Sequence, residues 1–261
     1  MENFVTRILH LPPVVSEHGA ALDNLLLYVH ILMFALFIGW SAFFIYTIFR
    51  FSQKRNPKAD YHGVKSHLTN YLEVAVAVIE AVLLVGFALP LWARGTSASK
   101  YPAEKDSTVI RVIGRQFNWM ARYPGPDGVF GKGDIKFVTG ENPLGVDASD
   151  PHSKDDVLVQ SSEIYVPLGK PVIAHISSLD VIHCFAIKPM RVTQDAIPGL
   201  MIPVWFKPTQ LGTYQINCAQ LCGNGHSSMR GLFHVVTQEE FDTWLKKQPK
   251  MGAGAAANSY E

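Results

Sequence analysis

Two long apolar runs dominate the N-terminal third of the chain. Residues 25–49 contain no Asp, Glu, Lys or Arg, and at about 1.5 Å per residue they would reach about 37 Å as a helix. Residues 71–93 form a second run with Tyr71 and Trp92 near its ends, where membrane spans concentrate aromatic side chains. Both runs are long enough to cross a hydrocarbon core of about 30 Å. The pattern predicts a hairpin of two transmembrane helices over residues 25–93.

The charges next to these runs predict the orientation of the hairpin. The connection 50–70 carries five basic residues, Arg50, Lys54, Arg55, Lys58 and Lys65, against one acid, Asp60. Residues 1–24 contain one basic residue, Arg7. Because short cytoplasmic loops are enriched in Lys and Arg, we expect loop 50–70 in the cytoplasm of a bacterium. Both termini, the N-terminal segment 1–24 and everything from about residue 95 onward would then lie on the periplasmic side of the inner membrane.

The second apolar run carries two acids, Glu73 and Glu80, and the first carries His30. A charged side chain at the centre of a membrane costs at least about 2.5 kcal/mol, so such residues are functional candidates. Glu73 lies near the cytoplasmic edge, where it either extends to water or has a function. We expect Glu80 to face a partner subunit or a polar cavity. His30 is more typical of a packed or interfacial histidine than of a metal ligand.

Beyond residue 95 the pattern changes to short alternating runs separated by Pro and Gly. These runs are residues 109–114, 163–177, 181–187, 212–218 and 231–236. Period-2 alternation with turn residues between predicts an all-β sandwich or barrel over residues 95–248. Its last segment differs, because Thr237 and Glu240 fit a capping box and Phe241, Trp244 and Leu245 form one helical stripe. A short helix should therefore close the β domain, followed by a disordered tail, 249–261.

A polar insertion, residues 124–156, interrupts the β pattern. It contains seven acidic residues and three lysines, a net charge of −4. Loops of this length are usually functional or flexible. Two interpretations stay open: a solvated surface loop, or a docking face for a basic partner.

Composition narrows the function classes. Charged residues make up 17% of the 261 residues, against about 25% in ordinary soluble proteins, and the deficit lies in the two apolar runs. A net charge of +1 argues against a nucleic-acid-binding protein, which needs a basic surplus. Three cysteines are too few for a small scaffold held by disulfides.

The densest chemical signal lies between the last two predicted strands. Residues 218–229 read C-x-x-x-C-x-x-x-H-x-x-M, formed by Cys218, Cys222, His226 and Met229. A further imidazole is available at His183. Thiolate, imidazole and thioether ligands together favour copper among the common metals. Such a spacing suits a loop that wraps around a metal.

Four interpretations of these residues compete. A disulfide between Cys218 and Cys222 would leave the histidines and Met229 unexplained. A structural zinc site of two Cys and two His has the right ligand number but makes no use of Met229. A mononuclear blue-copper site needs one thiolate and leaves the second cysteine over. A pair of copper ions bridged by both thiolates, with one histidine each, uses every ligand.

These features together resemble subunit II of the haem-copper cytochrome c oxidases. The resemblance rests on the two-span hairpin, the β domain and the motifs DVIH (180–183), QDAIPG (194–199) and CAQLCGNGHSSM (218–229), and it covers about residues 20–245. It implies a Greek-key cupredoxin fold that holds the dinuclear copper A centre. Cys218 and Cys222 would be the bridging thiolates, and His183 and His226 the terminal imidazoles. The weak ligands would be Met229 for one copper and the backbone carbonyl of Gln220 for the other.

The resemblance also implies a function and partners. The subunit would accept electrons from a c-type cytochrome and pass them to haem in subunit I, where oxygen is reduced and protons are pumped, with subunit III in the same membrane complex. Haem is expected only in the partner, because the chain lacks C-x-x-C-H. The alternatives are a copper A subunit of a nitric oxide reductase and a non-enzymatic copper carrier or redox sensor. Cys218 and Cys222 argue against direct quinol oxidation.

Several positions depart from the family pattern. Gln220 stands where a Glu is common, which argues against a magnesium ion at the subunit interface. Phe117 occupies the position of the tryptophan through which electrons enter, so that role falls to Phe117 or to a nearby aromatic such as Trp119 or Tyr123. Cys184 replaces a Ser, and we expect a buried, inert thiol. Leu200 stands where an Arg commonly follows the AIPG motif. Glu73 matches the glutamate at the cytoplasmic entrance of a proton pathway.

Overall fold

The chain divides into a helical unit and a β unit. The computed structural model describes residues 4–58, 61–63, 66–139, 142 and 144–251. Residues 21–94, with the first eleven residues, form the helical unit, and residues 12–20 join residues 95 onward in the β unit.

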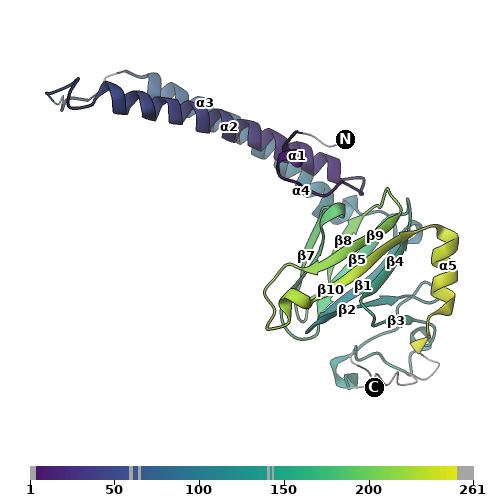
Figure 1. Ribbon diagram of the computed structural model, residues 1–261. Helices are drawn as coiled ribbons and strands as arrows, with labels where there is room; N and C mark the ends of the chain where they lie inside the picture. The colour runs from purple at the N-terminus through teal and green to yellow at the C-terminus, as the bar shows by residue number, and fades with distance from the viewer. Residues whose placement is uncertain (1–3, 59–60, 64–65, 140–141, 143, 252–261) are drawn as a thin grey trace. The chain divides into compact units, whose positions relative to one another are not determined.

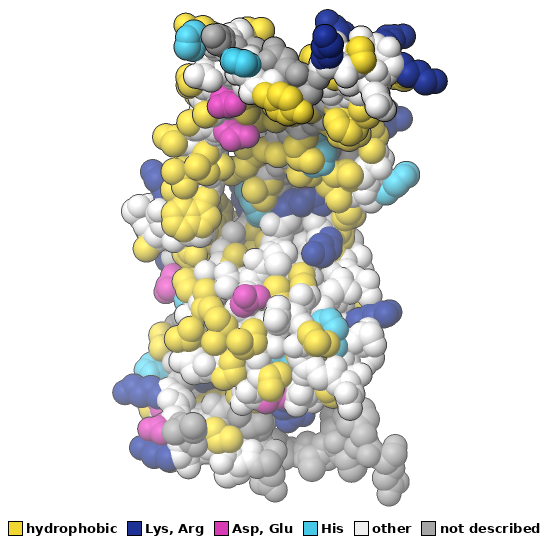
Figure 2. All heavy atoms as spheres, turned by 90° about the vertical axis from the view of Figure 1, so that its left-hand side faces the viewer, with side chains coloured by type: hydrophobic (Ala, Val, Ile, Leu, Met, Phe, Trp, Pro, Cys, Tyr) yellow, Lys and Arg dark blue, Asp and Glu magenta, His cyan; other side chains and the backbone are white. Residues whose placement is uncertain are grey.

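The helical unit consists of two long helical runs (Figure 1). After the short α1 (Phe4–Ile8), the first run is α2 (Gly19–Arg50), and the second joins α3 (Leu68–Ala81), a π-helical stretch η1 (Val82–Ala88) and α4 (Leu89–Thr96). Both are long and apolar enough to cross a membrane, which confirms the two predicted helices and extends each by a few residues. Their apolar side chains are exposed on the protein surface (Figure 2). The wide π turn ends just before Pro90, whose ring displaces the carbonyl four residues earlier in a regular helix.

The β unit is a sandwich of two five-stranded sheets, as predicted. The first has the order β3-β2-β1-β5-β8 and the second β4-β10-β9-β6-β7. The strands are β1 (Thr108–Arg115), β2 (Asn118–Tyr123), β3 (Val157–Val159), β4 (Glu163–Pro167), β5 (Val172–Ser178), β6 (His183–Ile187), β7 (Val192–Ala196), β8 (Ile202–Phe206), β9 (Gly212–Cys218) and β10 (Arg230–Val236). Short 3₁₀ turns are η2 (Ala98–Lys100), η3 (Glu104–Asp106), η4 (Ile135–Phe137), η5 (Pro151–Ser153), η6 (Lys188–Met190) and η7 (His226–Ser228).

Every predicted strand is present, and the run 163–177 holds two of them, β4 and β5. The alternating pattern did not predict four strands, β2, β3, β7 and β8. In β2 the residues after Asn118 are all buried, so the strand does not alternate. β7 is mostly polar, β3 has three residues and β8 contains Pro203, which fits its place at a sheet edge. The four missed strands are thus buried on both faces, very short, mostly polar or interrupted by Pro.

The core lies between the sheets, and the closing helix α5 (Gln238–Lys247) covers one side of it (Figure 1). Trp119, Phe185, Phe206 and Phe233 are fully buried there. The capping box at Thr237 and Glu240 is present in both directions. Phe241 is buried, and Trp244 stacks on Tyr165 at 4.3 Å between ring centroids. The predicted helix and its apolar stripe are thus confirmed.

The insertion 124–156 is anchored on the outer face of the first sheet. Arg122 of β2 pairs with Asp156, and both side chains are buried. Gly131 N–H donates to the same carboxylate at 3.0 Å, and the Arg111 guanidinium lies 4.3 Å from the Phe130 ring centroid. The insertion therefore has buried contacts that a fully solvated loop would lack.

Both ends of the β unit are held by backbone pairing. In the N-terminal segment, Val15 is buried, donates to Pro189 O at 3.0 Å and accepts from Thr209 N–H at 2.9 Å. At the other end, Lys250 bridges to Val157 and Met251 N–H donates to Asp156 O at 2.8 Å. The predicted disorder of the tail therefore does not extend to residues 249–251, and the rest of the tail, 252–261, lies outside the described residues.

Candidate metal centre

The candidate ligands come together at one end of the sandwich. β9 ends at Cys218, β10 begins at Arg230, and the connection between them holds the C-x-x-x-C-x-x-x-H-x-x-M motif. His183 is the first residue of β6, which pairs with β9 through Phe185 and Cys218. Strand pairing thus brings His183 next to Cys218 although 35 positions separate them.

The ligand atoms surround the two cysteine sulfurs. Cys218 Sγ lies 3.7 Å from Cys222 Sγ, 3.9 Å from His183 Nδ1 and 3.1 Å from the Gln220 carbonyl oxygen. Cys222 Sγ lies 3.5 Å from His226 Nδ1 and 3.8 Å from Met229 Sδ.

These separations fit metal binding, and no disulfide joins the cysteines. A sulfur–sulfur bond is about 2.05 Å long, and all three cysteines are free. Two thiolates about 2.3 Å from one ion at a tetrahedral angle lie about 3.8 Å apart, and a thiolate and an imidazole nitrogen about 3.5 Å apart. Every sequence-predicted ligand is therefore where a soft metal ion can reach it.

An aspartate orients the first histidine. Asp180 Oδ1 lies 2.8 Å from His183 Nε2, which leaves Nδ1 directed toward Cys218. The other carboxylate oxygen accepts from Gln116 N–H at 2.7 Å. Burial raises the pKa of Asp180, but the hydrogen bonds from Gln116, His183 and Val181 together hold it below its ordinary value. A carboxylate behind a metal-binding histidine is a recurrent arrangement. Sequence analysis gave Asp180 no role, although its position three residues before His183 is a signal that could have found it.

The turn at residues 116–117, which contains no candidate ligand, contacts the loop that carries the two cysteines. The Gln116 side-chain amide donates to the Cys222 carbonyl at 2.6 Å. The Phe117 ring lies against Gly223 and Gly225, and a Cβ added at Gly225 would come within 2.4 Å of it. Gly223 has φ +130°, which favours glycine. Sequence analysis missed the role of Gln116, because no local pattern connects it to a loop 106 positions away.

Most of the candidate ligand side chains are shielded from solvent, and His226 is partly exposed. His183, Met229 and Cys222 are all buried. Burial, with Cys218 close by, raises the pKa of Cys222 to about 11. Without a metal the thiol is therefore protonated at neutral pH, and metal binding must release a proton.

The third cysteine is not part of this group. Burial and the neighbouring Asp195 raise the pKa of Cys184 to about 12, and the side chain is 4% exposed. This agrees with the expected inert thiol, because thiolate is the reactive form.

The candidate aromatic residues have different environments. Phe117 is 38% exposed, whereas Trp119 has no exposed surface. Trp119 packs edge-on against His183 at 6.0 Å between centroids, and Tyr123 is buried and donates to Tyr165 O. Of the three candidates, Phe117 is therefore the one whose ring reaches the surface.

The acids and the histidine of the apolar runs belong to the helical unit. Glu73 and Glu80 are both exposed on α3, and their spacing of seven residues puts them on the same helix face. His30 Nδ1 bonds to the Leu26 carbonyl at 2.8 Å, as a packed histidine does.

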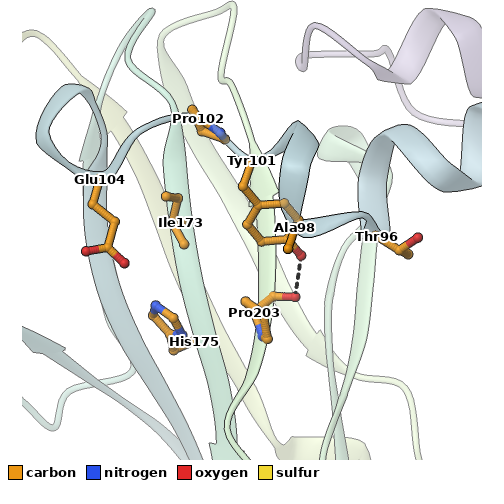
Figure 3. A pocket seen from close by; sticks show the side chains of 8 residues that line it. All are labelled: Thr96, Ala98, Tyr101, Pro102, Glu104, Ile173, His175 and Pro203. Carbon is orange, nitrogen blue, oxygen red and sulfur yellow. Dashed lines mark hydrogen bonds between the residues drawn. The ribbon is translucent and has the colours of Figure 1, made fainter.

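A separate pocket of about 250 Å³ lies on the β unit, and Figure 3 shows its eight lining residues. Tyr101 donates to the Pro203 carbonyl at 2.9 Å across it, beside Ile173, Glu104 and His175. Burial, reinforced by Arg111, lowers the pKa of His175. In the described part of the chain, the group of ligand atoms that could hold a metal is the one at His183, Cys218 and Cys222, and this pocket contributes none of them.

Comparison with known proteins shows the family of the chain. A model of the family described as cytochrome c oxidase subunit II, periplasmic domain, matches residues 108–236. The alternative cytochrome c oxidase subunit 2 of Bradyrhizobium diazoefficiens is 31% identical over 247 residues, which cover 95% of this chain and 87% of that protein. The chain belongs to the cytochrome c oxidase subunit II family.

Other similar proteins carry the same description. The probable cytochrome c oxidase subunit 2 of Rickettsia bellii is 30% identical over 93% of this chain and 84% of its own. Among solved structures, the periplasmic domain of subunit II from Bradyrhizobium japonicum is 29% identical, with a TM-score of 0.41 over 56% of this chain and 95% of that domain. As a member of this family, the chain combines two apolar helices with a cupredoxin-like β-sandwich, and the family implies copper as the metal.

Proposed function

We propose that this chain is the subunit through which electrons enter a respiratory haem-copper oxidase, and that it binds a dinuclear copper A centre. Cys218 and Cys222 would bridge the two ions, and His183 and His226 would each bind one of them. Met229 would be the weak ligand to one ion and the Gln220 carbonyl the weak ligand to the other.

The distribution of ligands around the two sulfurs supports two ions rather than one. The Cys218 sulfur has one imidazole and one carbonyl oxygen as neighbours, and the Cys222 sulfur has one imidazole and one thioether. The described ligand atoms that all lie within 4.8 Å of one another belong to His183, Cys218 and Cys222, without His226. A single tetrahedral ion would need both imidazoles in one such group, so zinc and mononuclear copper fit less well.

Copper in this setting would supply reversible one-electron transfer. The protein keeps the ligands in place: Asp180 fixes the ring of His183, Gln116 holds the Cys222 backbone, and burial excludes water. A site whose ligands move little needs little reorganisation when an electron arrives or leaves. No substrate bond is broken in this subunit.

The partners follow from this role. We infer a c-type cytochrome as donor and haem in subunit I as acceptor, with subunit III in the same complex. The basic loop 50–70 supports a cytoplasmic position for that loop, and therefore a periplasmic position for both termini and the β unit. Gln220 in place of the common Glu supports an interface without magnesium.

Metal analysis and electron paramagnetic resonance of the full chain test the copper centre. We expect two coppers per chain and a mixed-valence signal. Cys222→Ser should abolish that signal, whereas Cys184→Ser, the matched control, should keep it. One zinc per chain, or a single-copper spectrum, would refute the proposal.

We also propose that Glu73 is the entrance of a proton pathway into subunit I. Its support is its place one to two turns from the start of α3 and the presence of Glu80 on the same helix face. In the assembled oxidase, Glu73→Gln should slow oxygen turnover and leave the copper signal unchanged, with Tyr71→Phe as a neighbouring control. Unchanged turnover would count against this role.

A further inference from the structure

The metal end of the β unit has almost no charge. Strand pairing brings five connections to this end: 116–117, 160–162, 179–182, 197–201 and 219–229. They contain 25 residues, and Asp180 is the only one among them that is Asp, Glu, Lys or Arg. Its carboxylate is 27% exposed and is occupied by Gln116, Val181 and His183.

Large apolar side chains are exposed at this end. Leu221, between the two cysteines, is 78% exposed and Ile182 is 45% exposed. We call the following exposed side chains the metal-end face: Phe117, Leu179, Val181, Ile182 and Leu221. Leu200 and Met201 continue the apolar surface beyond it. Exposed apolar groups concentrated in this way mark interaction sites.

The residues that hold the metal-binding loop also hold this face together. Leu179 N–H donates to Gly114 O at 3.0 Å, and Asp180 accepts from Gln116 N–H. Phe117 lies directly on Gly223 and Gly225 of the cysteine loop. A partner seated on the metal-end face therefore contacts a ring that touches the backbone of the metal-binding loop.

The surrounding charges are balanced. Arg115 and Arg230 at the strand ends face outward, as does Asp195, and Glu163 is partly exposed. The acidic insertion is elsewhere: it leaves β2 at Tyr123, the end opposite Asn118 and the metal, and the two regions are separate in Figure 1. Neither sign of charge dominates near the metal.

We propose that the metal-end face docks the electron donor through apolar contact, and that the donor is a c-type cytochrome whose haem edge is surrounded by uncharged side chains. The inference rests on the proposed electron-transfer function and specifies its partner. Because interface cores are depleted of charge and steering requires one dominant sign of charge, donor binding should depend little on salt.

Rapid-mixing kinetics with the purified oxidase test this proposal. The probes are two reduced soluble c-type cytochromes, one strongly basic and one acidic. For both, the second-order rate constant should change by less than about twofold between low and physiological ionic strength. A fall of tenfold or more with the basic cytochrome alone would overturn the proposal, because it would reveal an acidic docking site.

Variants separate docking from electron transfer. Leu221→Ser and Val181→Ser should each raise the dissociation constant of the cytochrome about tenfold, measured by calorimetry on the copper-free full chain in detergent. Leu211→Ser is the control, because Leu211 is 48% exposed but lies in the connection at the opposite end of β9. Equal affinities for all three variants would refute the proposal.

A photo-crosslinker at position 221 of the intact oxidase gives an independent result. Capture of the cytochrome supports the proposal, and capture of the large haem-bearing subunit alone overturns it. Failure of the proposed function itself would look different: the centre would lack the mixed-valence signal, and no cytochrome would reduce it at any salt concentration.

Discussion

The metal-binding connections and the insertion 124–156 are both rich in glycine and lie at different ends of the same strand, β2. The first have one charged residue in 25, and the second has ten in 33. At the metal end, hydrogen bonds from uncharged groups such as the Gln116 amide hold the loop 219–229, which carries sulfur and imidazole ligands. In the insertion, one buried ion pair, Arg122–Asp156, holds a loop whose charges point to solvent. Two glycine-containing loop regions of one domain are thus ordered by different forces.

The largest expected effect is the loss of stability when the buried ion pair of the insertion is broken. Removing one partner of a buried ion pair costs about 3–5 kcal/mol, because the other charge is left unpaired. Arg122→Met should therefore lower the free energy of unfolding of the β unit by about that amount, measured by denaturant titration. The copper signal should persist under folding conditions.

A double variant sharpens this prediction. Burial raises the pKa of Asp156 even though Arg122 and Gly131 favour its charged form, so the pair carries a desolvation cost. Arg122→Met with Asp156→Leu should recover most of the lost stability. If the double variant is as unstable as the single one, the pair itself is the stabilising element.

At the metal end, the close packing of Gly225 should matter next. Gly225→Ala would push a Cβ to within 2.4 Å of the Phe117 ring, and overpacking costs about 1–3 kcal/mol. Gly133→Ala in the insertion is the control, because its Cβ would meet ordinary contacts from 3.4 Å. Thermal unfolding compares the two, and equal midpoints would show that the metal loop adapts freely.

A smaller effect, on the retention of copper, is expected when the hydrogen bond from Gln116 to the cysteine loop is removed. Gln116→Leu removes the donor to the Cys222 carbonyl, and one hydrogen bond contributes about 1 kcal/mol. The variant should release copper to a chelator a few times faster than the native protein. Gln215→Leu on β9 is a control of the same size change, and equal release rates would contradict the role of Gln116.

The smallest effect should be the pH response of an exposed pair in the insertion, His152 and Asp127. The hydrogen bond between them raises the pKa of His152 above 6.5 and lowers that of Asp127 below 3.8. The histidine contribution is present below pH 6.5 and is lost as pH rises through the raised value, whereas the aspartate contribution is lost as pH falls through the lowered value. Both are present between about pH 4 and 6.5.

The measurement is the thermal midpoint at about pH 5.5 and about pH 8. The native protein should lose slightly more stability on going to the higher pH than His152→Gln does. Identical changes would mean that the pair has no effect on folding.

The sequence was informative wherever one local pattern carries the structure. The apolar runs, the capping box of α5 and the spacing within 218–229 are of this kind. His183 was noted as a further available imidazole, and the resemblance to the family gave it the role of a terminal ligand. What it could not predict depends on contacts between distant segments. The burial of Trp119 follows from sheet pairing, the link from Gln116 to Cys222 crosses 106 positions, and the order of the insertion depends on one arginine in β2.

The burial of Cys184 limits what oxidation can do to this protein. Three thiols allow three intramolecular pairings, and exchange among them proceeds through thiolate. Cys184 is 4% exposed and burial raises its pKa to about 12, whereas the Cys218 and Cys222 sulfurs lie only 3.7 Å apart. We therefore expect oxidation of the metal-free chain to join Cys218 to Cys222, and reduction to return both sulfurs to the metal.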